Sequence, residues 1–186
     1  MLSASAARGS VWEYADRGEG NMDYDIAIQY ELCLGCHSCE LACAVAHSDS
    51  KNLRGAIGET SPAARIFVEA APPYKLPMTC RHCKDAPCVD ACSSGAMRSD
   101  GSGLVSNAAG TCVGCWMCVM VCPYGVVRPD YRLKQAVKCN RECMGCAAIP
   151  ACVQACPTGA LTFVSGENWT KERRVGYIKG FRTTQI

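Results

Sequence analysis

Four closely spaced runs of cysteine constrain this chain more than any other feature of its sequence. The third run has the spacing Cys-x2-Cys-x2-Cys-x3-Cys-Pro, and the first run repeats that spacing without the proline. The second and fourth runs lengthen the middle gap to four and five residues, and a proline again follows the fourth run. The runs comprise Cys33, Cys36, Cys39 and Cys43; Cys80, Cys83, Cys88 and Cys92; Cys112, Cys115, Cys118 and Cys122; and Cys143, Cys146, Cys152 and Cys156.

Spacing of this kind predicts iron–sulfur ligation. Bacterial ferredoxins hold 4Fe–4S clusters with the spacing of the third run, and each cluster takes four thiolates. Sixteen cysteines in four runs therefore predict four 4Fe–4S clusters. A short chain with four such clusters is best interpreted as a conduit for electrons.

Two other uses of cysteine fit the sequence less well. Disulfide frameworks occur in secreted chains with an even number of cysteines, whereas this chain has 17 cysteines and no apolar signal segment in residues 1–22. Structural zinc takes Cys-x2-Cys pairs separated by a longer spacer, so a zinc-stabilised interaction module is the weaker alternative.

Composition points the same way. The chain has 186 residues with only three Phe and three Trp, and its hydrophobic fraction of 49% includes the cysteines. We expect metal–thiolate bonds to stabilise so thin a core, because ligation free energy becomes folding free energy. The net charge of +2 comes with no basic tract, which argues against nucleic-acid binding. No apolar stretch approaches the ~20 residues of a membrane span, so we expect a protein of the reducing cytoplasm.

A short structural unit is expected around each run. Helical turns should follow Cys36, Cys88, Cys115 and Cys152, and the first of them should continue past Cys43 as a helix. After the last cysteine of the other three runs, a glycine turn should lead into a strand. Short strands are expected at Ile26–Tyr30, Ile66–Ala70, Ala96–Arg98, Leu104–Ser106, Val126–Arg128, Ala136–Lys138 and Leu161–Val164. Residues 48–64 and 71–79 lack ligands and should be surface excursions.

Three segments carry a resemblance to a known family. They are Cys80-Arg-His-Cys83-x4-Cys88, Cys112-Val-Gly-Cys115-Trp-Met-Cys118-x3-Cys122-Pro123 and Cys152-x3-Cys156-Pro157-Thr158-Gly159-Ala160-Leu161. Over roughly residues 23–165 the chain resembles the four-cluster iron–sulfur subunits of molybdenum and tungsten oxidoreductases, hydrogenases and CO dehydrogenases.

The resemblance implies which cysteines share a cluster, because in that family the first motif pairs with the fourth and the second with the third. The implied sets are Cys33, Cys36, Cys39 with Cys156; Cys143, Cys146, Cys152 with Cys43; Cys80, Cys83, Cys88 with Cys122; and Cys112, Cys115, Cys118 with Cys92.

The implied fold is α+β, with two ferredoxin-like lobes of short β-hairpins and short helices around four iron–sulfur clusters. The first lobe would combine motifs one and four, and the second lobe motifs two and three. The expected parts are a flexible N-terminal tail at 1–22, the first lobe at 23–47 and 136–166, a surface excursion at 48–79, the second lobe at 80–135 and a partner-docking C-terminal tail at 167–186.

The fourth run departs from the family pattern because it contains a fifth cysteine, Cys139. The family opens this motif with Lys-Cys-x2-Cys, and Lys138-Cys139 matches that opening, but three residues separate Cys139 from Cys143. Cys143-x2-Cys146 restores the usual pair. We favour Cys143 and Cys146 as ligands, with Cys139 as the alternative ligand.

Other residues near the ligands have ordinary interpretations. A hydrogen-bonding or solvated role is favoured for His37 and His82, and His47 is assigned to no site. Packing is favoured over shielding of a cluster for the residues beside the third run, Trp116, Met117 and Met120. Solvated surface charge is favoured over counter-charge for the basic residues beside ligands, Arg81, Lys84, Lys138 and Arg141.

The expected function is electron transfer without catalysis, in which iron changes valence and no substrate bond is made or broken. The chain has no Rossmann glycine fingerprint and no phosphate loop, so we expect flavin and nicotinamide to belong to other subunits. The resemblance implies a subunit in anaerobic metabolism that connects a catalytic oxidoreductase subunit to a second redox partner, such as a flavin subunit or a ferredoxin. The third run favours a tungsten-pterin partner of the aldehyde oxidoreductase class, with a CO dehydrogenase or hydrogenase partner as the alternative. A free polyferredoxin is a further alternative.

Overall fold

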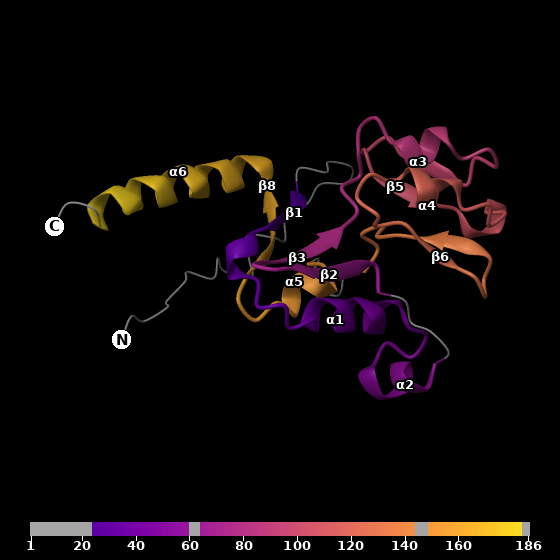
Figure 1. The fold of residues 1–186 in the computed structure, drawn as a ribbon, viewed down its shortest axis with the longest axis horizontal. Helices are drawn as coiled ribbons and strands as arrows, with labels where there is room; N and C mark the ends of the chain where they lie inside the picture. The colour runs from indigo at the N-terminus through magenta and orange to yellow at the C-terminus, as the bar shows by residue number, and fades with distance from the viewer. Residues whose placement is uncertain (1–23, 60–63, 144–148, 184–186) are drawn as a thin grey trace.

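The computed structural model describes residues 24–59, 64–143 and 149–183 (Figure 1). Strands form four separate two-stranded antiparallel sheets. The pairs are β1 (Tyr24–Ile28) with β8 (Leu161–Ser165), β2 (Ile66–Ala71) with β3 (Tyr74–Thr79), β4 (Met97–Ser99) with β5 (Val105–Asn107), and β6 (Arg128–Asp130) with β7 (Gln135–Val137). The first pair joins the first and the last strand of the described chain, and the other three pairs are hairpins.

Helices are short, with two exceptions. The 3₁₀ turns η2 (Tyr30–Leu32) and η3 (Ala109–Thr111) precede the first and third runs. The helices are α1 (Ser38–His47), α2 (Leu53–Gly58), α3 (Pro87–Asp90), α4 (Met117–Val121), α5 (Ala151–Gln154) and α6 (Gly166–Thr183). The predicted α+β class, with short hairpins and short helices, is confirmed.

Most local predictions hold to within one or two residues, and the helix after the first run does continue to His47. Two regions differ from the prediction. Residues 48–59 and 64–79 are more regular than the expected excursion. Asn52 caps α2 by accepting a hydrogen bond from the Gly55 N–H at 2.8 Å, and β3 pairs with β2. The expected C-terminal tail is largely a helix, α6.

Buried residues gather in two main clusters. The first core contains the aliphatic and aromatic residues of β1, β2 and β8, together with three cysteines: Ile26, Ile66, Leu161, Phe163, Cys39, Cys43 and Cys152. The second core has smaller residues: Ala86, Met97, Val105, Cys118, Val127 and Ala136. A third, small cluster contains Cys80, Val126 and Cys139, and Phe67 of β2 and Met78 of β3 pack against it. Cysteine is thus a core residue throughout the described chain.

Helix α6 extends away from the body of the molecule (Figure 1). It continues directly from β8 and contacts mainly β8 and β1. Val175, Tyr177 and Ile178 are exposed on it. Within the described ranges, no helix combines the length and the apolar character that crossing a bilayer requires.

Candidate iron–sulfur sites

The first and third runs have the same backbone conformation. A 3₁₀ turn leads to the first cysteine, and the glycine before the second cysteine has φ +67° in both runs, at Gly35 and Gly114. The residue after the second cysteine is also left-handed, with φ 59° at His37 and 64° at Trp116, and a helix then begins. Two left-handed residues curl the chain tightly, and glycine takes the first of them because it has no Cβ to clash.

The second, third and fourth runs end in the predicted glycine turn. Gly95, Gly125 and Gly159 have φ between 63° and 70°, and each N–H donates to the carbonyl of the last cysteine of its run. The residue that follows each glycine is almost fully buried, at Ala96, Val126 and Ala160. This turn therefore anchors the last cysteine of each run to a core.

One pocket is lined by four cysteines from two distant runs. Cys33, Cys36 and Cys39 of the first run line it together with Cys156, Pro157 and Ala160 from the fourth run and the turn after it. Besides the four thiols, the described lining contains mostly apolar groups together with His37 and Thr158, and it has no carboxylate. Soft thiol donors are the ligands that iron–sulfur clusters take. Burial raises the pKa of Cys39 to about 11, and Cys156 adds to the rise.

The remaining cysteines of the first and fourth runs also come together. Burial raises the pKa of Cys43 to about 12, and Cys143 and Cys139 raise it further. Burial likewise raises the pKa of Cys152, again with contributions from Cys143, Cys43 and Cys139. Because one thiolate disfavours ionisation of another nearby, these four thiols are neighbours. Cys146 lies outside the described residues.

In the second core, cysteines of the second and third runs lie close to one another. Burial raises the pKa of Cys88, and Cys80 and Cys122 raise it further. Burial raises the pKa of Cys118 to about 11, with additions from Cys112, Cys92, Cys115 and, from the second run, Cys88. Cys122 therefore lies near Cys88 of the second run, and Cys92 near Cys118 of the third.

Backbone amides point at several of the sulfur atoms. The N–H groups of Arg65, Met97 and His82 donate to Cys43, Cys92 and Cys80 at 3.2, 3.3 and 3.5 Å between nitrogen and sulfur. Such bonds favour the thiolate form, which is the form that binds metal.

The described residues contain no group of three or more Cys, His, Asp or Glu side chains close enough to hold a single metal ion. Ligands of one zinc ion all lie about 2.3 Å from a common centre. The thiolates of a cubane bind four different irons and so stand farther apart. A zinc site therefore needs its thiolates closer together than a 4Fe–4S site does.

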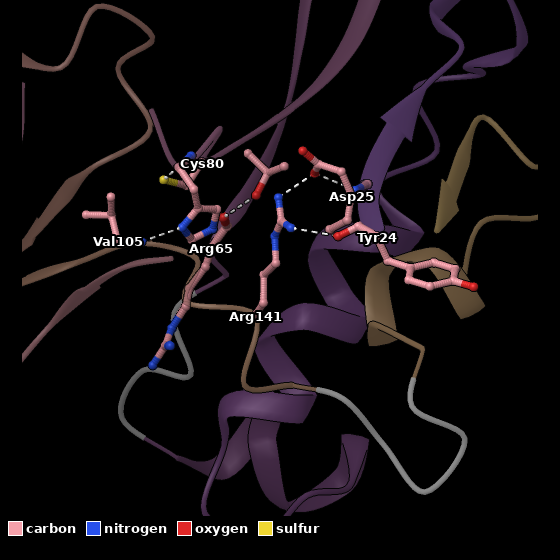
Figure 2. Close-up of polar contacts among 9 residues, drawn as sticks. Tyr24, Asp25, Arg65, Cys80, Val105 and Arg141 are labelled. Carbon is pink, nitrogen blue, oxygen red and sulfur yellow. Dashed lines mark hydrogen bonds and ion pairs between the residues drawn. The ribbon is translucent and has the colours of Figure 1, made fainter. Parts of the chain in front are cut away.

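Two basic residues differ from the sequence-based interpretation. Lys138 and Arg141 are only 3% and 7% exposed, so neither is a solvated surface charge. Arg141 forms an ion pair with Asp25 and donates to the Tyr24 carbonyl at 3.2 Å, as Figure 2 shows. Arg81 stays exposed, with its guanidinium carbon 4.9 Å from the centre of the Tyr124 ring, and Lys84 is also exposed.

Hydrogen bonding is confirmed for both histidines of the ligand loops. His37 pairs with Glu40 at 2.8 Å. The Nδ1 atom of His82 accepts from the Val105 N–H at 3.0 Å, and burial, followed by the charge of Lys138, lowers the pKa of His82 to about 3. Packing is wrong for Met117 and Met120, which are exposed, but Trp116 does pack edge-on against Tyr131.

Two contacts escaped the sequence reasoning. His47 lies one helical turn after Cys43, with its Nδ1 donating to the Cys43 carbonyl at 2.8 Å and lying 3.7 Å from the Cys43 sulfur. Arg65 directly precedes β2, a strand in contact with α1, and its N–H donates to the same sulfur. The i,i+4 spacing of Cys43 and His47 was a usable signal, whereas nothing in the sequence marked Arg65.

Together, the α+β fold and the cysteine-lined sites define an iron–sulfur protein of the ferredoxin-like class. The 4Fe-4S dicluster domain family matches residues 73–166. An iron–sulfur protein of Rhodospirillum rubrum is 44% identical over 147 residues, which are 71% of this chain and 77% of that protein. The electron transport protein HydN of Escherichia coli K12 is 37% identical over 147 residues, 71% of this chain and 82% of HydN.

The chain belongs to the 4Fe-4S dicluster domain family. It is an electron-transfer protein rather than an enzyme, and its cofactors are 4Fe–4S clusters; sixteen cysteines in four runs fit four of them. Some relatives are much longer. AegA of Escherichia coli K12 is 36% identical over 151 residues, but the chain spans only 22% of its length.

Proposed function

We propose that this chain relays single electrons through four 4Fe–4S clusters between a catalytic oxidoreductase subunit and a second redox partner. The observation that carries the proposal is the grouping of cysteines from runs far apart in sequence. Cys156 lines a pocket with Cys33, Cys36 and Cys39. Cys43 lies near Cys143, Cys122 near Cys88, and Cys92 near Cys118.

The ligand sets that we propose follow from these groups and from the family resemblance. They are Cys33, Cys36, Cys39 and Cys156; Cys43, Cys143, Cys146 and Cys152; Cys80, Cys83, Cys88 and Cys122; and Cys92, Cys112, Cys115 and Cys118. The first two sets belong to a lobe formed by residues 23–47 and 136–166, and the last two to a lobe at 80–135. Because β7 (Gln135–Val137) pairs with β6, and Ala136 lies in the second core, we move the boundary between the lobes from residue 136 to just after β7.

Exposure supports an order for the four clusters. Cys36 and Cys115, the second cysteines of the first and third runs, are exposed, whereas Cys43, Cys80 and Cys152 are buried. We place the sets that contain Cys36 and Cys115 at the two ends of the relay, where partners dock. Exposed Leu34, Val113, Met117 and Met120 beside them supply apolar contact surface.

The fourth run still has one cysteine more than the sites need. Cys139 is buried and neighbours both Cys43 and Cys80. We propose Cys143 and Cys146 as the ligands, because their spacing repeats that of Cys80 and Cys83, with Cys139 as the alternative ligand. Iron analysis of the three single Cys→Ser variants identifies the surplus cysteine, because its loss alone leaves all four clusters in place.

The partner that we propose is a tungsten-pterin enzyme of the aldehyde oxidoreductase class, on the strength of the third run's resemblance; a CO dehydrogenase or a hydrogenase is the alternative. A flavin subunit or a ferredoxin would take the other end, and the reducing cytoplasm suits so many thiolates. The exposed helix α6 favours a docked subunit over a freely diffusing polyferredoxin.

Anaerobic purification from the native source tests the proposal. We expect a brown protein with about sixteen irons and as much acid-labile sulfide per chain, which elutes with a catalytic oxidoreductase subunit. Elution alone, near 19.9 kDa plus the mass of the clusters, would instead identify a free carrier. The metal in the co-eluting subunit distinguishes tungsten from molybdenum, nickel or iron chemistry.

A further inference from the structure

Lys138 is a buried amine at the passage between the two cores. It follows β7, whose Ala136 belongs to the second core, and it directly precedes Cys139. Only 3% of the residue is exposed. Its Nζ donates to two backbone carbonyls, those of Val105 and, at 2.8 Å, Cys139. These bonds fix the position of the head group against β5 of the second core.

No carboxylate neutralises this side chain within the described ranges. The ion pairs found there join His37 to Glu40 and Arg141 to Asp25, so neither involves Lys138. A buried charge without a partner is costly and is normally paired or bound to a metal site. The nearest basic residue along the chain, Arg141, differs because Asp25 neutralises it (Figure 2).

Cysteines of the second run lie around the Lys138 head group. Burial raises the pKa of Cys80, and the charge and hydrogen bond of Lys138 oppose that rise. Lys138 acts on Cys88 in the same sense. A chain of hydrogen bonds also links Lys138 to the Cys80 sulfur. Lys138 donates to the Val105 carbonyl, the Val105 N–H donates to His82, and the His82 N–H donates to the sulfur.

We propose that Lys138 is the counter-charge of the cluster held by Cys80, Cys83, Cys88 and Cys122, and that it raises the reduction potential of that cluster selectively. The inference rests on the proposed function. A 4Fe–4S cluster with four thiolates is already an anion, and each transfer adds one electron without forming or breaking a bond. A fixed ammonium in a dry site favours the reduced form, because Coulomb attraction is strong at low dielectric.

Selectivity follows from where the other cations lie. Arg65 is the basic residue that acts on Cys43 and Cys143, and its guanidinium bonds the Asn140 side chain at 2.6 Å. Lys84 directly follows Cys83 but is exposed, so water screens its charge. Lys138 and Lys84 are therefore a matched pair: both are lysines beside ligands of one site, one buried and the other solvated.

The test is a redox titration, followed by electron paramagnetic resonance, of the full chain purified anaerobically with its clusters. Lys138→Met and Lys138→Gln should each make one cluster harder to reduce. At a fixed potential its ratio of reduced to oxidised form should fall about tenfold or more, which is a shift of about 59 mV for one electron. Lys138→Arg should stay near the wild type, and the control Lys84→Met should leave every midpoint unchanged.

Each outcome decides the matter. Unchanged midpoints in Lys138→Met and Lys138→Gln, with full iron content, would overturn the proposal. Loss of one cluster in these two variants but not in Lys138→Arg would support it, because charge alone separates them; loss in Lys138→Arg as well would assign Lys138 a steric role and overturn it. A wild-type chain without iron and sulfide would instead refute the proposed function itself.

Discussion

The first and second cores contain the same kind of cysteine loop, but the strands and helices around them differ in length. Around the first core, β1 and β8 are five residues each and α1 has ten. Around the second core, the four strands are three residues each, and α3 and α4 have four and five. Isolated hairpins and helices this short are unstable in water.

The cores differ in side chains as well. The first core buries Ile26, Ile66, Leu161 and Phe163, whereas the residues of the second core are mostly Ala and Val with one Met and one Cys. Burial of apolar surface contributes about 25 cal/mol per Å², so the second core has less to stabilise it. We infer that the first core retains structure without iron, while the second core depends on its ligated metal.

Removal of iron should give the largest difference between the two cores. After anaerobic chelation of the purified holoprotein, amides of β4, β5, β6 and β7 should exchange hydrogen as in an unfolded chain, because little else holds these strands. Amides of β1 and β8 should keep measurable protection. Hydrogen–deuterium exchange read by mass spectrometry compares the two sets in one sample. Equal loss of protection in both would contradict the comparison.

Truncation of an aromatic side chain tests the first core directly. Phe163→Ala should destabilise the iron-free chain by about 3–5 kcal/mol, the usual cost of removing a buried Phe, and abolish the remaining protection of β1 and β8. Val105→Ala, in the second core, is the matched control and should leave β1 and β8 unchanged. Denaturant unfolding followed by circular dichroism gives the free energies. A larger effect from Val105→Ala would reverse the assignment.

Equivalent glycines offer a finer comparison. An added Cβ at Gly114 would lie 2.6 Å from the Lys134 backbone oxygen, whereas at Gly35 it would meet only the flexible Lys75 side chain. Both residues are left-handed, which costs an alanine about 1–2 kcal/mol. Gly114→Ala should cost about 1–3 kcal/mol more, because the backbone must shift. Thermal unfolding of the two holoproteins measures the difference, and equal melting temperatures would refute it.

Thiol reactivity gives the smallest expected contrast. Burial raises the pKa of Cys43 to about 12 and that of Cys118 to about 11. A raised pKa keeps the thiol neutral in the folded chain, and the stability associated with it is present below about pH 9 and lost as pH rises through these values. Below pH 11, Cys118 of the iron-free chain should therefore be alkylated at least about tenfold faster than Cys43, and faster still because loss of iron opens the second core. Mass spectrometry of timed alkylation reads both rates, and faster labelling of Cys43 would count against a more stable first core.

The cysteine loops were predictable from sequence because their cause is local. Glycine at fixed offsets permits the left-handed turns, and Pro87 at the first position of α3 suits a helix start. The sequence predicts a surface excursion rather than a strand at β3, and Pro72, Pro73 and Pro77 do argue against strand pairing. The strand pairs nonetheless as half of an isolated two-stranded hairpin, where each strand has a free edge that tolerates proline.

Burial of the charged residues was not predictable, because it depends on segments far apart in the chain. Lys138 is buried by β5, which lies 33 residues earlier, and Arg141 by β1, which lies 116 residues from it. Helix α6 was missed for a different reason. Its sequence contains several glycines and threonines, which are weak helix formers.

Metal analysis of the anaerobically purified chain tests the central claim most directly, since every site and both cores are interpreted through cysteine ligation of iron. We predict about sixteen irons and about sixteen acid-labile sulfides per folded chain, with four one-electron reductions in a redox titration. A folded chain that contains zinc and no sulfide would contradict the account.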